Sequence, residues 1–271
     1  MTVETAAEIS LTSLSPFGIE VTGLNVETVT DEELSTLKQL LADQGVAVIR
    51  NQSSSQTISD DTFVRFLQRL GQLTFTVGEK PVVGHPLLNI VSNVGRDRPP
   101  RSVFHTDTSY VAKPPAYTSL RAVKLPRQGG ETLFCNQYTA YDRLPRAVSQ
   151  KLQGAEILHV VSGLSLEDGE ETQTWQPLFR QHPTSGKVAM YLSTPERCQR
   201  LRIPSGELSV EKSQQVIRLL YLHSIRRCQL YRHHWQSGDI VLWDNRCTMH
   251  RADHSNVIGD RVLHRGLITE G

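Results

Sequence analysis

The sequence predicts a mainly β fold with helical insertions, in which two sheets form a barrel or a jelly roll. Many short stretches of β-branched and aromatic residues are bounded by turn residues, as at 239–245 (DIVLWDN) and 261–268 (RVLHRGLI). Few segments have the apolar spacing of helices, and strands do not alternate with helices as in nucleotide-binding βαβ folds. With 271 residues, of which 38% are hydrophobic, the chain is long enough for one large core. We therefore expect one domain over residues 1–271.

The first helix is predicted over residues 30–45, TDEELSTLKQLLADQG. Thr30 and Glu33 have the spacing of a capping box, and leucines three or four residues apart form one apolar stripe. Gly45 is a typical helix terminator. A β-rich run, VAVIR at 46–50, follows directly and predicts a buried strand.

Three later segments also have helical spacing. Residues 59–71 have the same features as the first helix, with apolar residues on one face and a glycine, Gly71, at the end. Residues 139–154 predict a broken helix, and residues 209–226 predict the last long helix, capped by Ser209.

The charges are almost balanced, with 29 lysines and arginines against 28 aspartates and glutamates. No strong global field favours nucleic acid or an anionic membrane as a partner, and we expect neither. No apolar run reaches the roughly 18 residues of a membrane span and the N-terminus has no signal-peptide pattern, so we expect a cytoplasmic protein. The four cysteines form no CxxC pair, which favours free thiols over a zinc knuckle or a disulfide frame.

A histidine and an aspartate two residues apart occur in VFHTDTSY, residues 103–110. If this stretch is a strand, His105 and Asp107 project from the same face and can share one metal ion. Such a pair alone is more often explained by ordinary hydrogen bonding. A metal site therefore needs a third ligand.

His250 is the candidate for that ligand, at the point in VLWDNRCTMHRADH (241–254) where an apolar strand ends and polar residues begin. With His105 and Asp107 it completes two histidines and one carboxylate. This is the facial set that binds non-haem Fe(II) and leaves positions open for a co-substrate and dioxygen. Taken alone, a histidine near a strand end is more often a hydrogen-bonded residue at the rim of the fold than a ligand.

Two arginines occupy one face of the predicted strand 261–268. Alternation puts Arg261 and Arg265 on the same side as Leu263 and Leu267, and an arginine cannot escape burial by losing its proton. Intramolecular salt bridges or an exposed face would satisfy both arginines. The metal set favours a different assignment, in which one arginine binds a dicarboxylate co-substrate and the other binds an acidic substrate.

In their order and spacing, these motifs and several others along the chain resemble the taurine dioxygenase/TfdA family of Fe(II)- and 2-oxoglutarate-dependent dioxygenases. The resemblance runs from about residue 15 to the end and is carried by FHTDTSY, PPAYTSLRAVKLPRQGGETLF, AYDRLP, SGDIVLWDNRCTMH and RVLHRGLI. It implies a double-stranded β-helix, the cupin-like jelly roll, as a single catalytic domain. It also implies Fe(II) as the metal, with 2-oxoglutarate and O2 as co-substrates.

The same resemblance implies roles for single residues. The residues similar to the iron ligands of the family are His105, Asp107 and His250. Thr132 in GGETLF resembles the threonine that hydrogen-bonds the 2-oxoglutarate carboxylate, and Arg261 resembles the arginine that forks the same group. Arg265 matches the arginine that faces the acidic group of the substrate in members that oxidise sulfonates and carboxylates.

The implied activity is oxidation of a C–H bond in a small, acidic substrate, with release of succinate and CO2. Desaturation or an oxidative rearrangement in a biosynthetic pathway would use the same iron chemistry and stays open. Thr74 and Thr76 stand near where taurine-oxidising members carry a substrate-binding histidine, which predicts a substrate other than taurine. Asp107 fills the iron position that halogenases leave to a halide, so halogenation is not expected. A small molecule is the expected partner, and a homo-oligomer is possible.

Two other classes compete with this assignment. His250 and His254 have the spacing that zinc peptidases use on a helix, but Arg251 replaces their glutamate and no amphipathic helix surrounds it. A non-catalytic jelly-roll binding module with a structural metal is the other alternative. The presence of Thr132 and Arg261 beside all three ligand candidates argues against it.

Overall fold

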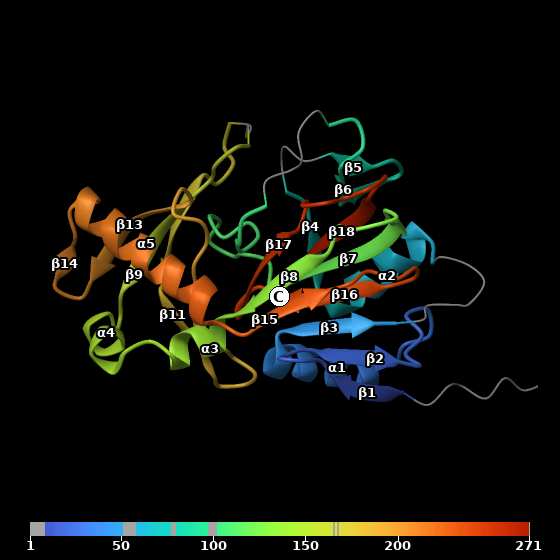
Figure 1. Ribbon diagram of the computed structural model, residues 1–271, viewed down its shortest axis with the longest axis horizontal. Helices are drawn as coiled ribbons and strands as arrows, with labels where there is room; N and C mark the ends of the chain where they lie inside the picture. Colours follow the sequence, from blue (N-terminus) through green and yellow to red (C-terminus); the bar gives the residue numbers. More distant parts are fainter. Residues whose placement is uncertain are drawn as a thin grey trace, which may run out of the picture.

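Two β-sheets packed face to face form the centre of the protein (Figure 1). The computed structural model describes residues 9–50, 58–76, 80–96, 102–164, 166 and 168–270. The larger sheet contains β1 Ser10–Ser13, β2 Ile19–Thr22, β3 Val46–Ile49, β4 Gln72–Thr74, β5 Pro81–Val82, β6 His85–Ser92, β7 Tyr117–Lys124, β16 Ile240–Asp244 and β18 Val262–Thr269. Its order is β1-β2-β3-β16-β7-β18-β6-β5, and β4 pairs with β18 beside this row.

The smaller sheet has the order β15-β8-β17 and is antiparallel. Its strands are β8 Thr132–Asn136, β15 Leu230–His233 and β17 Thr248–Ala252. The inner faces of the two sheets share one apolar core, to which Val48, Leu120 and Leu263 contribute from the larger sheet and Phe134 and Tyr231 from the smaller one. The predicted jelly roll with helical insertions is confirmed.

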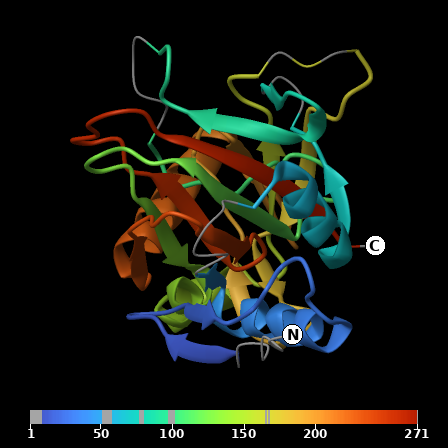
Figure 2. The same ribbon diagram turned by 90° about the vertical axis from the view of Figure 1, so that its right-hand side faces the viewer.

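Two helices, α1 Asp31–Gln44 and α2 Asp60–Leu70, cover the outer face of the larger sheet (Figure 2). The capping box is present as predicted, because the Thr30 hydroxyl accepts a bond from the Glu33 N–H and the Glu33 carboxylate accepts one from the Thr30 N–H. Gly45 ends α1 in the left-handed region, at φ 76°. Because the apolar stripes of both helices face the strands, this layer closes the core on one side.

A second lobe packs against the outer face of the smaller sheet (Figure 1). Its elements are α3 Gln137–Asp142, α4 Arg146–Lys151, β9 Glu156–Val160, β10 Gln173–Pro177, β11 Phe179–Gln181, β12 Val188–Met190, β13 Cys198–Ile203, β14 Gly206–Glu207 and α5 Val210–Arg227. Leu133 and Met249 of the smaller sheet pack against Ile217 and Leu220 of α5.

The helical predictions in this lobe are confirmed. The broken helix appears as α3 and α4, and the Ser209 hydroxyl caps α5 by accepting from the Lys212 N–H. Within the described ranges, no helix is both long and apolar enough to cross a membrane.

Residues 103–110 do not form the predicted strand. Only His105 pairs, in an isolated antiparallel bridge with His250, and the chain turns at 107–110, where Thr108 has φ 43°. Long-range side-chain bonds favour this turn over an extended strand, since the Thr106 hydroxyl donates to the carbonyl oxygen of Leu192 at 2.7 Å.

His250 lies beyond the end of the apolar strand β16, as predicted, but within a further strand that the sequence did not predict. A turn at 245–247 separates β16 from β17, and His250 lies in the middle of β17. Because the backbone of β17 pairs with β8, polar side chains there do not end the strand.

Candidate active site

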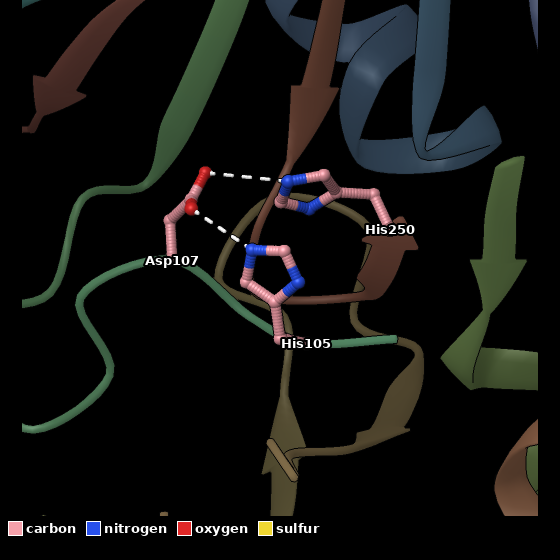
Figure 3. A group of neighbouring side chains, drawn as sticks. All are labelled: His105, Asp107 and His250. Atoms are coloured by element: carbon pink, nitrogen blue, oxygen red, sulfur yellow. Dashed lines mark ion pairs between the residues drawn. The ribbon is translucent and has the colours of Figure 1, made fainter. Parts of the chain in front are cut away.

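His105, Asp107 and His250 lie together where the smaller sheet meets the turn at 107–110 (Figure 3). The two histidines face each other in the antiparallel bridge, whose N–H···O bonds are both 3.0 Å long. Oδ1 of Asp107 lies 3.5 Å from Nε2 of His105, and Oδ2 lies 3.7 Å from Nε2 of His250. One donor atom from each residue falls within 4.8 Å of the others. Atoms bound to one ion at about 2.1 Å are themselves roughly 3 Å apart, so this spacing fits a metal.

The second ring nitrogen of His105 fixes its tautomer. Nδ1 lies 2.9 Å from the carbonyl oxygen of Val103, which can only accept a hydrogen bond, so Nδ1 carries the proton. In the neutral ring, the other nitrogen, Nε2, then offers its lone pair on the side that faces Asp107. A backbone carbonyl that orients the ring in this way is typical of histidines that bind metals.

His250 is a buried, neutral imidazole. Burial lowers the pKa of His250 to about 3, because desolvation outweighs the nearby Asp107 carboxylate, which would raise it. The ring packs against the indole of Trp243, with centroids 4.4 Å apart. A histidine must be deprotonated to bind a metal, so its state suits a ligand.

Asp107 is ionised although it is only 4% exposed. Burial alone would raise the pKa of its carboxyl group, but the interactions with His250, Arg265 and His105 outweigh desolvation and hold that pKa well below its usual range. The site therefore offers one carboxylate and two imidazole nitrogens.

A chain of hydrogen bonds holds Asp107 from the side of the larger sheet. The Thr118 hydroxyl of β7 donates to Oδ2 of Asp107 at 2.9 Å, and Nδ2 of Asn245 donates to the Thr118 hydroxyl oxygen at 2.7 Å. The Trp243 indole N–H in turn donates to Oδ1 of Asn245 at 3.0 Å. Asn245 lies in the turn at 245–247, directly before β17. The same turn therefore helps to orient Asp107 and leads into the strand that carries His250.

Arg261 and Thr132 are adjacent in the wall of a cavity beside these residues. Arg261 is 1% exposed, and no carboxylate of the described segments lies within 4.0 Å of its guanidinium. Its Nε donates to the carbonyl oxygen of Gly130 at 2.8 Å, and Nη2 donates to the Thr132 hydroxyl oxygen at 3.2 Å. Burial lowers the pKa of Arg261 to about 10, with Glu131 opposing the effect, so the group stays protonated at neutral pH. A buried cation of this kind favours an anionic ligand.

The Thr132 hydroxyl has its hydrogen available as a donor. Its oxygen accepts from Arg261 and also from the Trp235 indole N–H, at 3.1 Å. Two donors aimed at one hydroxyl oxygen leave its own hydrogen to be donated elsewhere.

Arg265 lies against the metal-site carboxylate, with Nη1 3.6 Å from Oδ1 of Asp107. Its Nη2 donates to Oδ1 of Asn89 at 3.4 Å. The predicted alternation is confirmed, since Arg261 and Arg265 line the same cavity. His264 turns to the other face, with Nδ1 2.7 Å from Oδ1 of Asp60.

The cavity has a volume of about 460 Å³, within the range of small-molecule sites. Its wall includes both histidines of the metal cluster and apolar side chains such as Leu120 and Trp243. Of the described residues, the arginines that line it are Arg96, Arg197, Arg261 and Arg265. No aspartate or glutamate of the described chain lines it. The cavity is therefore suited to anions.

Sequence reasoning missed Arg197, Thr194 and Ser162, which also line the cavity. They lie in the β9–β10 and β12–β13 connections, where no motif or periodicity singles them out. Trp243 also forms part of the cavity wall.

A model of the family described as taurine catabolism dioxygenase TauD, TfdA family matches residues 10–267. The chain belongs to this family. The alpha-ketoglutarate-dependent 2,4-dichlorophenoxyacetate dioxygenase of Cupriavidus pinatubonensis is 29% identical to this TauD/TfdA protein over 268 residues, covering 88% of this chain and 89% of the relative. Pentalenolactone F synthase of Streptomyces avermitilis is 28% identical over 297 residues, covering 96% and 93%. The crystal structure of a taurine dioxygenase from Burkholderia xenovorans superposes with a TM-score of 0.80 at 26% identity, covering 97% of this chain and 91% of that one.

This TauD/TfdA protein is an Fe(II)- and 2-oxoglutarate-dependent dioxygenase, with O2 as the oxidant. The predicted family, enzyme class and cofactors are confirmed, and the non-catalytic module is excluded with them. The zinc-peptidase alternative is wrong because His250 lies in β17, so His250 and His254 do not share a helix face.

Proposed function

We propose that His105, Asp107 and His250 hold the catalytic Fe(II). The convergence of their three donor atoms within 4.8 Å carries this proposal. The donors suit the ion, because two neutral imidazoles and one carboxylate form the facial set that leaves positions for small ligands. When bound, Fe(II) supplies the dioxygen and electron-transfer chemistry that protein side chains lack.

Arg261 and Thr132 are proposed to bind the distal carboxylate of 2-oxoglutarate. A guanidinium matches a carboxylate with two parallel hydrogen bonds, and the Thr132 hydroxyl supplies a further donor. Burial of Arg261 strengthens the ion pair because water no longer screens it. Arg261 and Thr132 would thereby orient 2-oxoglutarate within the cavity, whose wall also contains His105 and His250.

The prime substrate is proposed to be a small acid whose anionic group binds at Arg265. The excess of arginines over carboxylates in the cavity wall supports an anion. Apolar wall residues such as Leu120 would contact its hydrocarbon part and exclude water from the oxidised C–H bond. Succinate and CO2 would be released with each oxidised substrate molecule.

A substrate other than taurine is proposed from the segment before the metal turn. Thr76 is buried, and its hydroxyl lies 3.3 Å from that of Thr108. A short hydroxyl side chain there does not offer the imidazole expected of a taurine-oxidising member.

Hydroxylation is the proposed outcome, and desaturation or oxidative rearrangement is the second candidate. The similarity to a relative named as a synthase supports the second candidate. Mass spectrometry of the product separates them, because hydroxylation adds one oxygen atom whereas desaturation removes two hydrogens.

We further propose that residues 1–271 act as one catalytic domain, a proposal that the family match over 10–267 supports. A cytoplasmic location, no nucleic-acid or membrane partner, and a possible homo-oligomer remain proposals from the balanced charge and ordinary composition.

Anaerobic titration tests the proposed site. The protein with Fe(II) and 2-oxoglutarate should show the visible charge-transfer band of the metal–2-oxoglutarate complex. Asp107→Ala should lose the band, whereas Asp260→Ala, which removes an exposed carboxylate paired with Lys124, should keep it. Full turnover by Asp107→Ala would defeat the ligand assignment.

Substrate-stimulated succinate formation tests the substrate class. A panel of sulfonates, sulfate esters, aryloxyacetates and amino acids should contain a stimulating acid, and Arg265→Met should raise its KM at least about tenfold. An uncharged compound that stimulates as strongly as every acid would contradict the assignment of Arg265.

A further inference from the structure

Arg197 lines the cavity, and the proposed function gives it no role. Its backbone is fixed in the β12–β13 connection, where its N–H donates to the carbonyl oxygen of Thr194 at 2.9 Å and its own carbonyl oxygen accepts from Val160 at 2.7 Å. Within the described ranges, its side chain has one hydrogen bond, in which Nε donates to the Ser162 hydroxyl at 3.2 Å. Among the residues of known placement, no carboxylate lies within 4.0 Å of its guanidinium. The Arg197 guanidinium is therefore positioned by the bond of Nε to Ser162, while its two terminal nitrogens have no partner among the described residues and can donate to a ligand.

Thr194 supplies a second, independent indication of a ligand. It is 5% exposed and lines the same cavity, and its buried Oγ1 has no hydrogen-bond partner in the described part of the chain. Buried hydroxyls are rarely left unsatisfied, because they lose their bonds to water. Thr194 and Arg197 are joined by a backbone hydrogen bond, and both line the cavity. An arginine and a threonine also line it at Arg261 and Thr132, whose side chains are hydrogen-bonded to each other.

The charges of the cavity leave room for a further anionic group. Among the described residues, four arginines line the cavity, and with the Fe(II) of the proposed site they carry six positive charges. Asp107 of the metal cluster and a 2-oxoglutarate dianion supply three negative charges, so three positive charges are left for the substrate to balance. Arg261 is taken by 2-oxoglutarate, and Arg265 lies beside the metal cluster. Arg265 belongs to β18 of the larger sheet and Arg197 to the β12–β13 connection of the second lobe, so the two guanidiniums enter the cavity from different elements.

We propose that Arg197 and Thr194 form a second anion subsite, and that the prime substrate is a dianion with acidic groups at both ends of a short carbon chain. One end binds at Arg265, and the other accepts bonds from the Arg197 guanidinium and the Thr194 hydroxyl. The intervening C–H bonds then lie beside His105 and His250. This inference rests on the proposed function, because that function assigns Arg261 to 2-oxoglutarate and Arg265 to the first acidic group.

Matched pairs of dianions and monoanions test this inference. The pairs are adipate with hexanoate, 4-sulfobutanoate with butanesulfonate, and 6-sulfohexanoate with hexanesulfonate, added to the holoenzyme at saturating 2-oxoglutarate. Binding is measured without oxygen as a shift of the charge-transfer band, and turnover is measured as succinate formation. At least one dianion should bind about tenfold more tightly than its matched monoanion.

Arg197→Met should weaken binding of that dianion at least about tenfold and change the KM of the monoanion and of 2-oxoglutarate less than about twofold. Thr194→Val should weaken dianion binding about threefold. Arg202→Met, on the same segment but paired with Glu156 at the surface, should change nothing. If Arg197→Met does not fold, Arg197→Lys keeps the charge without the planar fork and should give an intermediate loss.

Two results overturn the inference. One is that no dianion of the series binds the wild-type enzyme more tightly than its monoanion. The other is that the Arg197 variants weaken both members of a pair equally. Failure of the proposed function is distinguishable, because it removes the charge-transfer band of wild-type enzyme with Fe(II) and 2-oxoglutarate before any third compound is added.

Discussion

Both oxygens of Asp107 have partners besides the two histidines. The Thr118 hydroxyl donates to Oδ2, and Arg265 lies 3.6 Å from Oδ1. These contacts keep the carboxylate ionised and set its direction. The geometry of the metal cluster therefore depends on residues that no ligand motif contains.

Thr118→Val should weaken Fe(II) binding about tenfold, since partners of this kind typically contribute 10- to 100-fold to metal affinity. The change removes the donor to Asp107 and leaves Nδ2 of Asn245 without its acceptor. Affinity is measured by anaerobic Fe(II) titration. Thr36→Val, on the exposed side of α1, is the matched control. Unchanged affinity in Thr118→Val would contradict a positioning role.

Gly130→Ala should raise the KM for 2-oxoglutarate about tenfold or more. A Cβ at Gly130 would lie 2.9 Å from Cδ of Arg261, so the guanidinium would have to move from its bond to the Gly130 carbonyl oxygen. Gly186→Ala is the control, because both glycines have positive φ but nothing lies within 4 Å of a Cβ at Gly186. Equal effects of the two variants would mean that backbone strain, and not Arg261, is responsible.

At the scale of elements, the turn at 107–110 is held mainly by the lobe outside the smaller sheet. Nε2 of Gln176 in β10 donates to the carbonyl oxygens of Ser109, at 3.2 Å, and Val111, at 2.9 Å. His159 in β9 bonds the Ser109 hydroxyl at 2.9 Å. The lobe therefore contributes to the position of Asp107 as well as to the cavity wall.

Gln176→Leu should lower Fe(II) affinity and increase succinate formation that is not coupled to substrate oxidation, because the turn loses two backbone anchors. Gln181→Leu, which removes an exposed amide bonded to the Gly186 carbonyl oxygen, should leave both quantities unchanged. Iron titration and the ratio of succinate to product measure the effects. A variant with full affinity and coupling would show that the turn holds its shape without β10.

At the scale of the whole molecule, burial also shifts the pKa of titratable groups that do not line the cavity. His159 is fully buried, and burial together with the charge of Arg180 lowers its pKa to about 3, from 6.5 for an ordinary histidine. The unfolded chain therefore binds a proton at this position in a pH range where the folded chain does not. Stability from this group is present above pH 6.5 and is lost as the pH falls toward 3.

The free energy of unfolding should fall more steeply with acid in the wild type than in His159→Gln. Between pH 7 and pH 5.5 the difference between the two proteins should shrink by about 1 kcal/mol, because only the wild type carries the buried neutral imidazole. Urea denaturation at each pH, at equal metal content, measures it. Parallel pH profiles for the two proteins would contradict burial of a neutral His159.

The elements that sequence reasoning predicted correctly are those with local causes. The capping box of Thr30 and Glu33 needs only four residues, and the alternation of Arg261 and Arg265 needs only one strand. The turn that carries Asp107 was predicted as a strand, because its anchors lie elsewhere: Leu192 for Thr106 and Gln176 for Ser109.

The sequence by itself determined the jelly-roll class, the family, and the residue types needed for two histidines, one carboxylate and an anion-binding arginine. Periodicity, caps and ordered motifs encode these features along the chain. Only the tertiary structure decided that His105 pairs with His250, that Arg261 is buried away from carboxylates of the described residues, and that Arg197 reaches the same cavity. These properties depend on strand pairing and desolvation between residues far apart in sequence, which no local pattern records.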